Sequence, residues 1–303
     1  MCKMKFFSPL DLGFFLASLL NVIYFGSCYR LQASTQYRPV VIIHGVLDNA
    51  GTMNTLQTMI QKAHPGTNVT ALNLYPDEKS LKPLWPQVKD FGDALIQIMK
   101  DAQDGINIIC YSQGGVICRG VLSTIPDHNV NTFIALSSPL MGQFGDTNVF
   151  KFVPPEFRKE IYKFCYESIG QDHLSVCQYW NDPQHQDLFI EKSIFLAVLN
   201  NQTTNVNSTE WKKNFIRIKN LVMISGPDDG VITPWQSSHF AFFDEELNIV
   251  EMENQMVYKE DYFGLQTLHK RGALQKCIMS GVEHTHWHSN QTVFDNCIEP
   301  WLG

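Results

Sequence analysis

The chain has 303 residues, with 23 Lys and Arg against 30 Asp and Glu, so its formal net charge is −7. Hydrophobic residues make up 44% of the chain and charged residues 17%, a composition that is typical of a packed globular protein and excludes disorder as its main state. The acidic balance and the lack of any Lys and Arg block argue against binding to nucleic acid.

An apolar run near the N-terminus predicts a signal peptide. Lysines precede the 14 residues Leu12–Phe25. A bilayer span needs about 20 residues, whereas this length suits the core of an export signal. Small residues follow the run, so we expect cleavage after Cys28, with an uncleaved anchor as the alternative. Residues 29–303 should then form a single soluble domain without a stable membrane span.

Cysteines and glycosylation sequons agree with export. An even number of cysteines in an exported chain suggests disulfides, although six cysteines allow 15 pairings. Their clustering favours the pairs Cys110–Cys118, Cys165–Cys177 and Cys277–Cys297. Sequons of the form N-x-S/T stand at Asn68, Asn201, Asn207 and Asn290. Together with the export signal, they predict a glycosylated lumenal protein.

Strand and helix patterns alternate along most of the chain. Apolar runs predict strands at residues 40–43, 69–74, 106–110, 133–136, 221–224 and 277–279. Helical spacing predicts helices at residues 51–64, 84–99, 114–122 and 292–301. This alternation indicates an α/β protein with a mostly parallel, doubly wound sheet and helices on both faces.

The alternation lapses between residues 138 and 220. This segment is rich in aromatic residues and contains one of the cysteine pairs. We interpret it as a helical cap inserted over the C-terminal ends of the strands; the alternative for its aromatic residues is that they are simply the core of the insertion. The cap and the region of Trp235 and residues 240–243 are candidates for an apolar groove.

The third predicted strand ends in a candidate nucleophile, Ser112. Residues 109–115 read ICYSQGG between a buried strand and a helix, the context in which G-x-S-x-G forms a nucleophile elbow. Such a turn strains the serine and lifts its hydroxyl clear of the sheet. Gly114 and the small Cys110 stand two residues on either side, which lets strand and helix pass closely.

A serine hydroxyl needs a base, and in this class of fold an acid and then a histidine follow the nucleophile along the chain. Asp228 and Asp229 follow the fifth predicted strand, and His284, His286 and His288 follow the last one. Either aspartate alone is often only a turn residue, and alternate histidines can also form a metal site. The residues by themselves leave the choice within each group open.

The end of the first predicted strand supplies candidates for an oxyanion hole. His44-Gly45-Val46 lies there, so the backbone amides of Val46 and Gln113 can both point at a developing oxyanion. His44 is expected to be a structural residue that packs under the hole, and not the general base.

Several segments around these positions resemble the palmitoyl-protein thioesterases. They are residues 38–45 (RPVVIIHG), 109–115 (ICYSQGG), 137–139 (SSP), 141–143 (MGQ), 226–235 (GPDDGVITPW), 284–285 (HT), 287–290 (WHSN) and 297–302 (CIEPWL). The resemblance covers about residues 38–303 and implies an α/β-hydrolase with Ser112 as nucleophile, Asp229 as acid and His284 as base. The choice within the aspartates and histidines rests on this resemblance alone, which also implies the three local disulfides and residence in the lysosome.

The function that we expect is hydrolysis of fatty-acyl thioesters through an acyl-enzyme, with acyl-CoA, S-acyl thiols and S-palmitoylated proteins or peptides as substrate classes. We expect neither a metal nor an organic cofactor. Sorting receptors that bind the glycans are expected partners, and secretion is the alternative location. The rival functions are a secreted lipase or carboxylesterase that acts on oxygen esters, a metal-dependent hydrolase and a non-catalytic lipid-binding protein.

Overall fold

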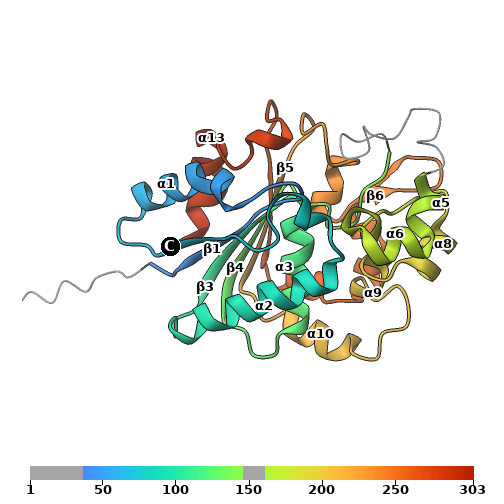
Figure 1. Ribbon diagram of the computed structural model, residues 1–303, viewed down its shortest axis with the longest axis horizontal. Helices are drawn as coiled ribbons and strands as arrows, with labels where there is room; N and C mark the ends of the chain where they lie inside the picture. Colours follow the sequence, from blue (N-terminus) through green and yellow to red (C-terminus); the bar gives the residue numbers. More distant parts are fainter. Residues whose placement is uncertain (1–36, 146–160) are drawn as a thin grey trace, which may run out of the picture. The chain divides into compact units, whose positions relative to one another are not determined.

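The computed structural model describes residues 37–145 and 161–303 (Figure 1). The predicted signal peptide, and residues 146–160 of the predicted cap, lie outside the described residues. Across the two ranges that the structure describes, no helix is long and apolar enough to cross a membrane.

Six parallel strands form the central sheet: β1 (Val40–Ile43), β2 (Val69–Leu72), β3 (Ile106–Tyr111), β4 (Val130–Leu136), β5 (Asn220–Ser225) and β8 (Leu274–Ile278). Their spatial order is β2-β1-β3-β4-β5-β8. The chain therefore leaves the centre in opposite directions from β1 and from β3, and the gap between these two strands is the switch point of the sheet. In open α/β sheets, ligands bind beyond the carboxyl ends of the strands at this point.

Each of the six predicted strands is confirmed. The last strand is Leu274–Ile278, slightly earlier than predicted, because this edge strand is only partly buried and has no continuous apolar run. The structure also contains a short antiparallel hairpin that the sequence did not predict, formed by β6 (Phe242–Phe243) and β7 (Ile249–Val250).

Helices cover both faces of the sheet. Figure 1 shows α1 (Asn54–Ala63) and α13 (Gln291–Val293) on one face, and α2 (Leu84–Lys100), α3 (Gln113–Thr124) and α10 (Ser208–Phe215) on the other. Two further short helices are α11 (Met256–Lys259) and α12 (Leu265–Lys270). The 3₁₀ and π segments are η1 (Ala50–Met53), η2 (Asp77–Leu81), η4 (Trp235–His239), η5 (Met252–Asn254), η6 (His284–His286), η7 (Phe294–Ile298) and η8 (Glu299–Trp301).

The pleat of each strand divides its side chains between two apolar cores. Val41 and Ile43 of β1 pack in the core on the side of α2 and α3, whereas Val40 and Ile42 pack in the core on the side of α1. Successive strand residues point to opposite faces, so a strand covered on both sides must be apolar throughout. Each such side chain contributes about 1.5–3 kcal/mol when it is fully buried.

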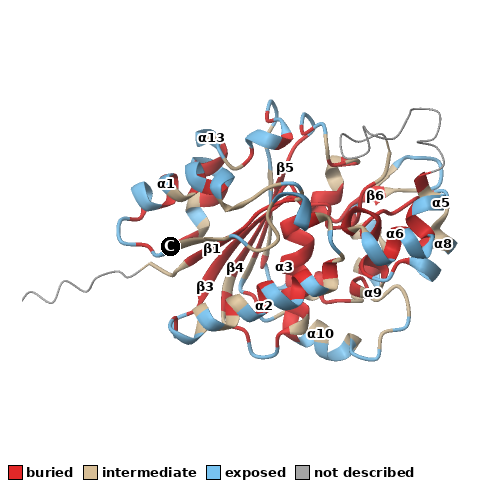
Figure 2. Ribbon diagram, in the orientation of Figure 1, coloured by how far each residue is buried: buried red, intermediate tan, exposed pale blue. Residues whose placement is uncertain are grey.

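Helix α3 is buried along nearly its whole length, as the red ribbon in Figure 2 shows. Arg119 lies inside it without exposure to solvent, and its guanidinium donates hydrogen bonds to Leu140 O, Leu199 O and Asn200 Oδ1. The guanidinium carbon also lies 3.9 Å from the ring centroid of Phe263. Burial lowers the pKa of Arg119 to about 9, so its charge is kept at neutral pH and binds α3 to the segments around it.

Short helices fill the described part of the chain between β4 and β5: α5 (Ile161–Tyr166), α6 (Ser168–His173), α7 (Ser175–Gln178), α8 (Gln186–Lys192) and α9 (Leu196–Leu199). Figure 1 shows α5, α6 and α8 beyond the end of the sheet toward which the strands run.

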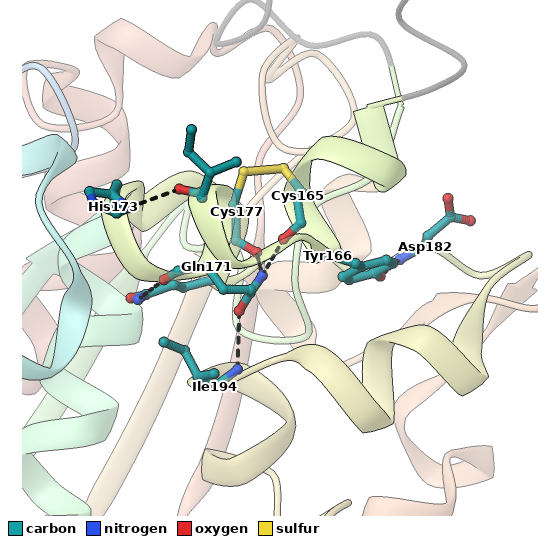
Figure 3. The surroundings of a disulfide bond; sticks show 9 residues. Cys165, Tyr166, Gln171, His173, Cys177, Asp182 and Ile194 are labelled. Carbon is teal, nitrogen blue, oxygen red and sulfur yellow. Dashed lines mark hydrogen bonds between the residues drawn. A yellow bond between two sulfur atoms is a disulfide. The ribbon is translucent and has the colours of Figure 1, made fainter.

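A disulfide between Cys165 and Cys177 joins α5 to α7 (Figure 3). The side-chain amide of Gln171 lies beside it and donates to Cys165 O (2.6 Å) and Cys177 O (2.8 Å). Its oxygen accepts from the Ile194 amide at 3.0 Å. These contacts tie α5, α6, α7 and the segment after α8 into one unit.

The structure contains the other two local disulfides as well. Cys110–Cys118 links β3 to α3, and Cys277–Cys297 links β8 to η7. The three bonds close loops with sequence separations of 8, 12 and 20 residues.

Replacing both Cys277 and Cys297 by Ser should lower the free energy of unfolding by about 2–4 kcal/mol, because the bond restricts the unfolded chain. Urea unfolding of the oxidised variant and the oxidised wild type measures this difference. Peptide mapping without reduction should recover all three pairs from the wild type. Free thiols at most of the six cysteines would contradict the three disulfide pairs.

Candidate active site

Ser112 stands in the tight turn between β3 and α3. Its backbone has φ 52° and ψ −126°, a conformation that costs free energy for any residue with a side chain. The turn is held on both sides, because the Ser112 amide donates to Leu136 O and its carbonyl accepts from the Gly115 amide, each at 2.9 Å. The nucleophile predicted from the motif therefore lies in a strained elbow.

Two glycines let α3 approach the sheet this closely. A Cβ atom on Gly114 would lie 2.6 Å from Ile43 O, and one on Gly115 would lie 2.0 Å from the Ser138 hydroxyl. Both distances are far below van der Waals contact. The elbow therefore requires glycine at these positions.

A chain of hydrogen bonds leads away from the Ser112 hydroxyl. His284 Nε2 lies 3.0 Å from Ser112 Oγ, and His284 Nδ1 lies 2.9 Å from Asp229 Oδ2. The backbone also holds the histidine, because its amide donates to Asp229 O at 2.8 Å and its carbonyl accepts from the Tyr111 hydroxyl at 2.9 Å. Ser112, His284 and Asp229 are all buried.

The Asp229 carboxylate is 2% exposed and is surrounded by donors. Besides His284, four groups donate to it: the amides of Val231 (3.1 Å) and Ile232 (2.7 Å), the hydroxyl of Ser137 (2.5 Å) and the indole N–H of Trp287 (2.7 Å). Burial by itself favours the neutral acid. Hydrogen bonds and the charge of His284 outweigh burial and hold the pKa of Asp229 below its ordinary value.

The other sequence candidates lie elsewhere. Asp228 is exposed, and its carboxylate accepts from the Gly281 amide at 2.7 Å. His286 is exposed, with its nearest acidic oxygen, on Glu283, at 3.9 Å. The His288 ring lies 5.0 Å from the ring of Tyr111, and burial lowers its pKa. In residues 37–145 and 161–303, no group of three or more His, Cys, Asp or Glu is arranged to hold a metal.

The predicted oxyanion residues flank the elbow. Gln113 is the first residue of α3, where a backbone amide has no acceptor within the helix. Val46 follows β1 and lines the same cavity as Ser112. His44 is buried beneath this turn, with its ring nitrogens 2.9 Å from Gly45 O and Leu74 O. It is therefore bound to the main chain, as expected of a structural residue.

A cavity of about 490 Å³ opens over Ser112 and His284. Part of its wall is apolar and comes from the loops after β4 and β5, from α7 and from the residue that follows α7: Pro139, Val176, Tyr179, Val231 and Ile232. The polar lining includes Asp48, Thr52, Thr285 and His288. Trp235 and Phe243, which the sequence suggested for the groove, line a separate hollow of about 350 Å³ that shares Ile232 with the cavity.

Sequence reasoning assigned no role to Ser137 or Trp287. The position of Ser137 held a signal, since it directly follows β4, whose neighbour β5 leads into the turn of Asp229. Carboxyl ends of adjacent parallel strands meet at one edge of the sheet. Trp287 gave no comparable signal, because an aromatic residue in a loop is most often core.

Known proteins resemble this chain over most of its length. The family model for palmitoyl protein thioesterase matches residues 39–284. The chain is 51% identical over 267 residues to lysosomal thioesterase PPT2 of Homo sapiens, with 88% of each chain covered. It is 48% identical to lysosomal thioesterase PPT2-B of Xenopus laevis (89% and 94% covered) and 40% identical to the PPT2 homolog of Drosophila melanogaster (91% and 96% covered).

Gly114→Ala should distort the elbow, because the new methyl group would meet the Ile43 carbonyl, which is part of the sheet. We expect a loss of about 1–3 kcal/mol in the free energy of unfolding and much slower labelling of Ser112 by a fluorophosphonate. Gly92→Ala in α2 is the matched control, since its methyl group would meet only the flexible end of Ile125 at 3.2 Å. Equal labelling rates for Gly114→Ala and wild type would contradict the close approach.

Proposed function

Because this chain belongs to the palmitoyl protein thioesterase family, we propose that it is a serine thioesterase that hydrolyses fatty-acyl thioesters to a free fatty acid and a thiol. The observation that carries this proposal is the hydrogen-bonded chain from Ser112 through His284 to Asp229, whose Ser112 end lines a cavity with an apolar wall. A nucleophile with its base supplies the chemistry, and the apolar wall suits an acyl chain.

In the first step, Ser112 Oγ attacks the thioester carbonyl while His284 Nε2 takes its proton. Asp229 holds the imidazole in the orientation that points Nε2 at the hydroxyl, and its charge stabilises the imidazolium that forms. The amides of Val46 and Gln113 donate to the oxyanion, a type of contact that contributes about 2.7–4 kcal/mol per donor. When the tetrahedral intermediate collapses, the carbon–sulfur bond breaks and the thiolate receives the proton from His284.

In the second step, water replaces the thiol beside His284 Nε2. The imidazole takes a proton from the water as its oxygen attacks the acyl-enzyme carbonyl, and the fatty acid leaves when Ser112 regains its proton. No metal or organic cofactor enters either step.

The protein works in the lysosome, in keeping with its similarity to the lysosomal thioesterases PPT2 of Homo sapiens and Rattus norvegicus. We also propose that residues 1–28 are removed and that glycans are attached on the export route. Asn68 and Asn207 are exposed, and Asn201 and Asn290 are partly exposed, so all four sequons have some access to solvent. Glycans at these positions would supply the ligands for a sorting receptor.

A secreted lipase or carboxylesterase would use the same residues on oxygen esters. Matched oxygen esters and thioesters of one chain length separate these activities, since only the leaving atom differs. A lipid-binding protein without activity would keep the cavity but would not react with a fluorophosphonate, because an unactivated serine is a poor nucleophile.

Ser112→Ala should lower turnover of palmitoyl-CoA by ~10⁴ or more, the loss typical when a triad member is removed. Urea unfolding should show an intact fold. Brief reaction of the wild type, followed by acid quench and mass spectrometry, should find the acyl group on the peptide that contains Ser112. Turnover by Ser112→Ala close to that of the wild type would remove the mechanism.

The preferred substrates should be small or exposed acyl thioesters, so kcat/KM should be higher for palmitoyl-CoA than for an S-palmitoylated protein. Val176 and Tyr179 line the cavity, and the Cys165–Cys177 bond ties the segment that bears them. We propose that helices α5–α9 form a cap with a narrow, stiff entrance. A free acyl chain can thread into it, whereas a folded carrier meets its rim, and poor contacts there raise the barrier without helping the transition state.

This preference is tested by measuring kcat/KM for both substrates at about pH 5 and about pH 7. Replacing Cys165 and Cys177 by Ser should loosen the cap and bring the two efficiencies closer. The Cys277 and Cys297 double variant is the matched control and should leave their ratio unchanged. Equal or better efficiency of the wild type on the palmitoylated protein would overturn the narrow-entrance argument and leave the triad untouched.

A further inference from the structure

Two neutral donors converge on the carboxylate oxygen that also faces His284. The Ser137 hydroxyl lies 2.5 Å from Asp229 Oδ2 and the Trp287 indole nitrogen lies 2.7 Å from it, while His284 Nδ1 lies 2.9 Å away. Ser137 follows β4 and Trp287 follows η6, so these donors come from separate parts of the chain. Neither side chain has any exposure to solvent.

The chemistry of these donors decides which form of Asp229 they stabilise. An indole N–H can only donate, so Trp287 binds the carboxylate and cannot accept a proton from a carboxylic acid. A hydroxyl can do both; here Ser137 donates to Asp229 Oδ2 at 2.5 Å, and its oxygen also lies 3.2 Å from His284 Nδ1. Oδ1 is bound by two backbone amides. The ring of donors therefore fits the ionised carboxylate and prevents its rotation.

We propose that Trp287 and Ser137 are positioning residues of the triad, which keep Asp229 ionised and aimed at His284 Nδ1 in acidic surroundings. This inference rests on the proposed function, because it concerns the reaction of Ser112. Neither residue touches the nucleophile. Trp287 acts through Asp229, whereas Ser137 acts through Asp229 and also directly on His284, whose Nδ1 lies 3.2 Å from the Ser137 hydroxyl oxygen.

Loss of either donor should shift the pH dependence of activity in one direction. The titratable groups around Asp229 are His284 on η6, Tyr111 at the end of β3 and the neighbouring Asp228. Burial raises the pKa of the Tyr111 hydroxyl, so this group stays neutral. With a donor lost, the pKa of Asp229 rises and its carboxylate holds the proton of the imidazolium more tightly. Each effect disfavours, at low pH, the protonation state in which the triad works, an ionised Asp229 beside a neutral imidazole.

Trp287→Phe tests the indole donor, because phenylalanine keeps an aromatic ring and loses the N–H. The profile of kcat/KM for palmitoyl-CoA between about pH 4 and about pH 8 reports the acid limb of the free enzyme. We expect this limb to move up by about one pH unit, with kcat at its plateau lowered by about tenfold or less and KM nearly unchanged. Trp85→Phe is the matched control, since its indole N–H donates to Ile194 O, a main-chain acceptor outside the triad, and its acid limb should match that of the wild type.

Ser137→Ala provides the second variant if Trp287→Phe does not fold. Serine and alanine both carry a Cβ, so the cost of φ 44° at this position is shared by both residues. Its acid limb should move in the same direction. A role limited to packing would lower kcat/KM by the same factor at every pH, and an unmoved limb in a folded variant overturns the inference. If the wild type itself fails to turn over thioesters, the proposed function fails instead.

Discussion

The buried carboxylate of Asp229 is the constraint on which the arrangement of the site depends. Removing a charged carboxylate from water costs several kcal/mol unless its oxygens find new partners. Here the partners come from its own turn after β5, from Ser137 after β4 and from the segment of His284 and Trp287 after β8. One charge therefore requires three loops to meet in one geometry, and that geometry points His284 at Ser112.

The Ser112 end of the proposed triad depends on packing and not on charge. Ser112 keeps an unfavourable backbone conformation only because the strand before it and the helix after it cannot move apart. Helix α3 is almost wholly buried, and Arg119 binds it from within to Leu140 O and Asn200. Packing in the interior of the domain therefore maintains the strained backbone of Ser112. A serine on a mobile loop would relax out of this conformation.

The sequence predicted the sheet well because a strand covered on both faces must be apolar throughout, and such runs are easy to find. It missed β6 and β7, since strands of two residues carry no pattern. The helices between β4 and β5 are also too short for a 3.6-residue period to emerge. Ser112 could be found because its signal is local, whereas Asp228 and Asp229 are adjacent in one turn, and only the resemblance distinguished them.

The role of Trp287 could not be predicted from the sequence, because it depends on which acceptor the indole N–H meets in the folded chain. That contact also bears on how a triad works in acid. In the proposed mechanism, His284 must be neutral to act as a base, while Asp229 must stay ionised. A charged imidazolium would keep Asp229 ionised, but only by holding the proton that His284 must lose. The charge of His284 therefore cannot favour both protonation states at once. A neutral donor lowers the pKa of a carboxylate and at the same time weakens its hold on the imidazolium proton. The Ser137 hydroxyl is such a donor to Asp229, and the indole N–H of Trp287 meets the same oxygen. A carboxylate held by neutral donors therefore favours both required protonation states as the pH falls.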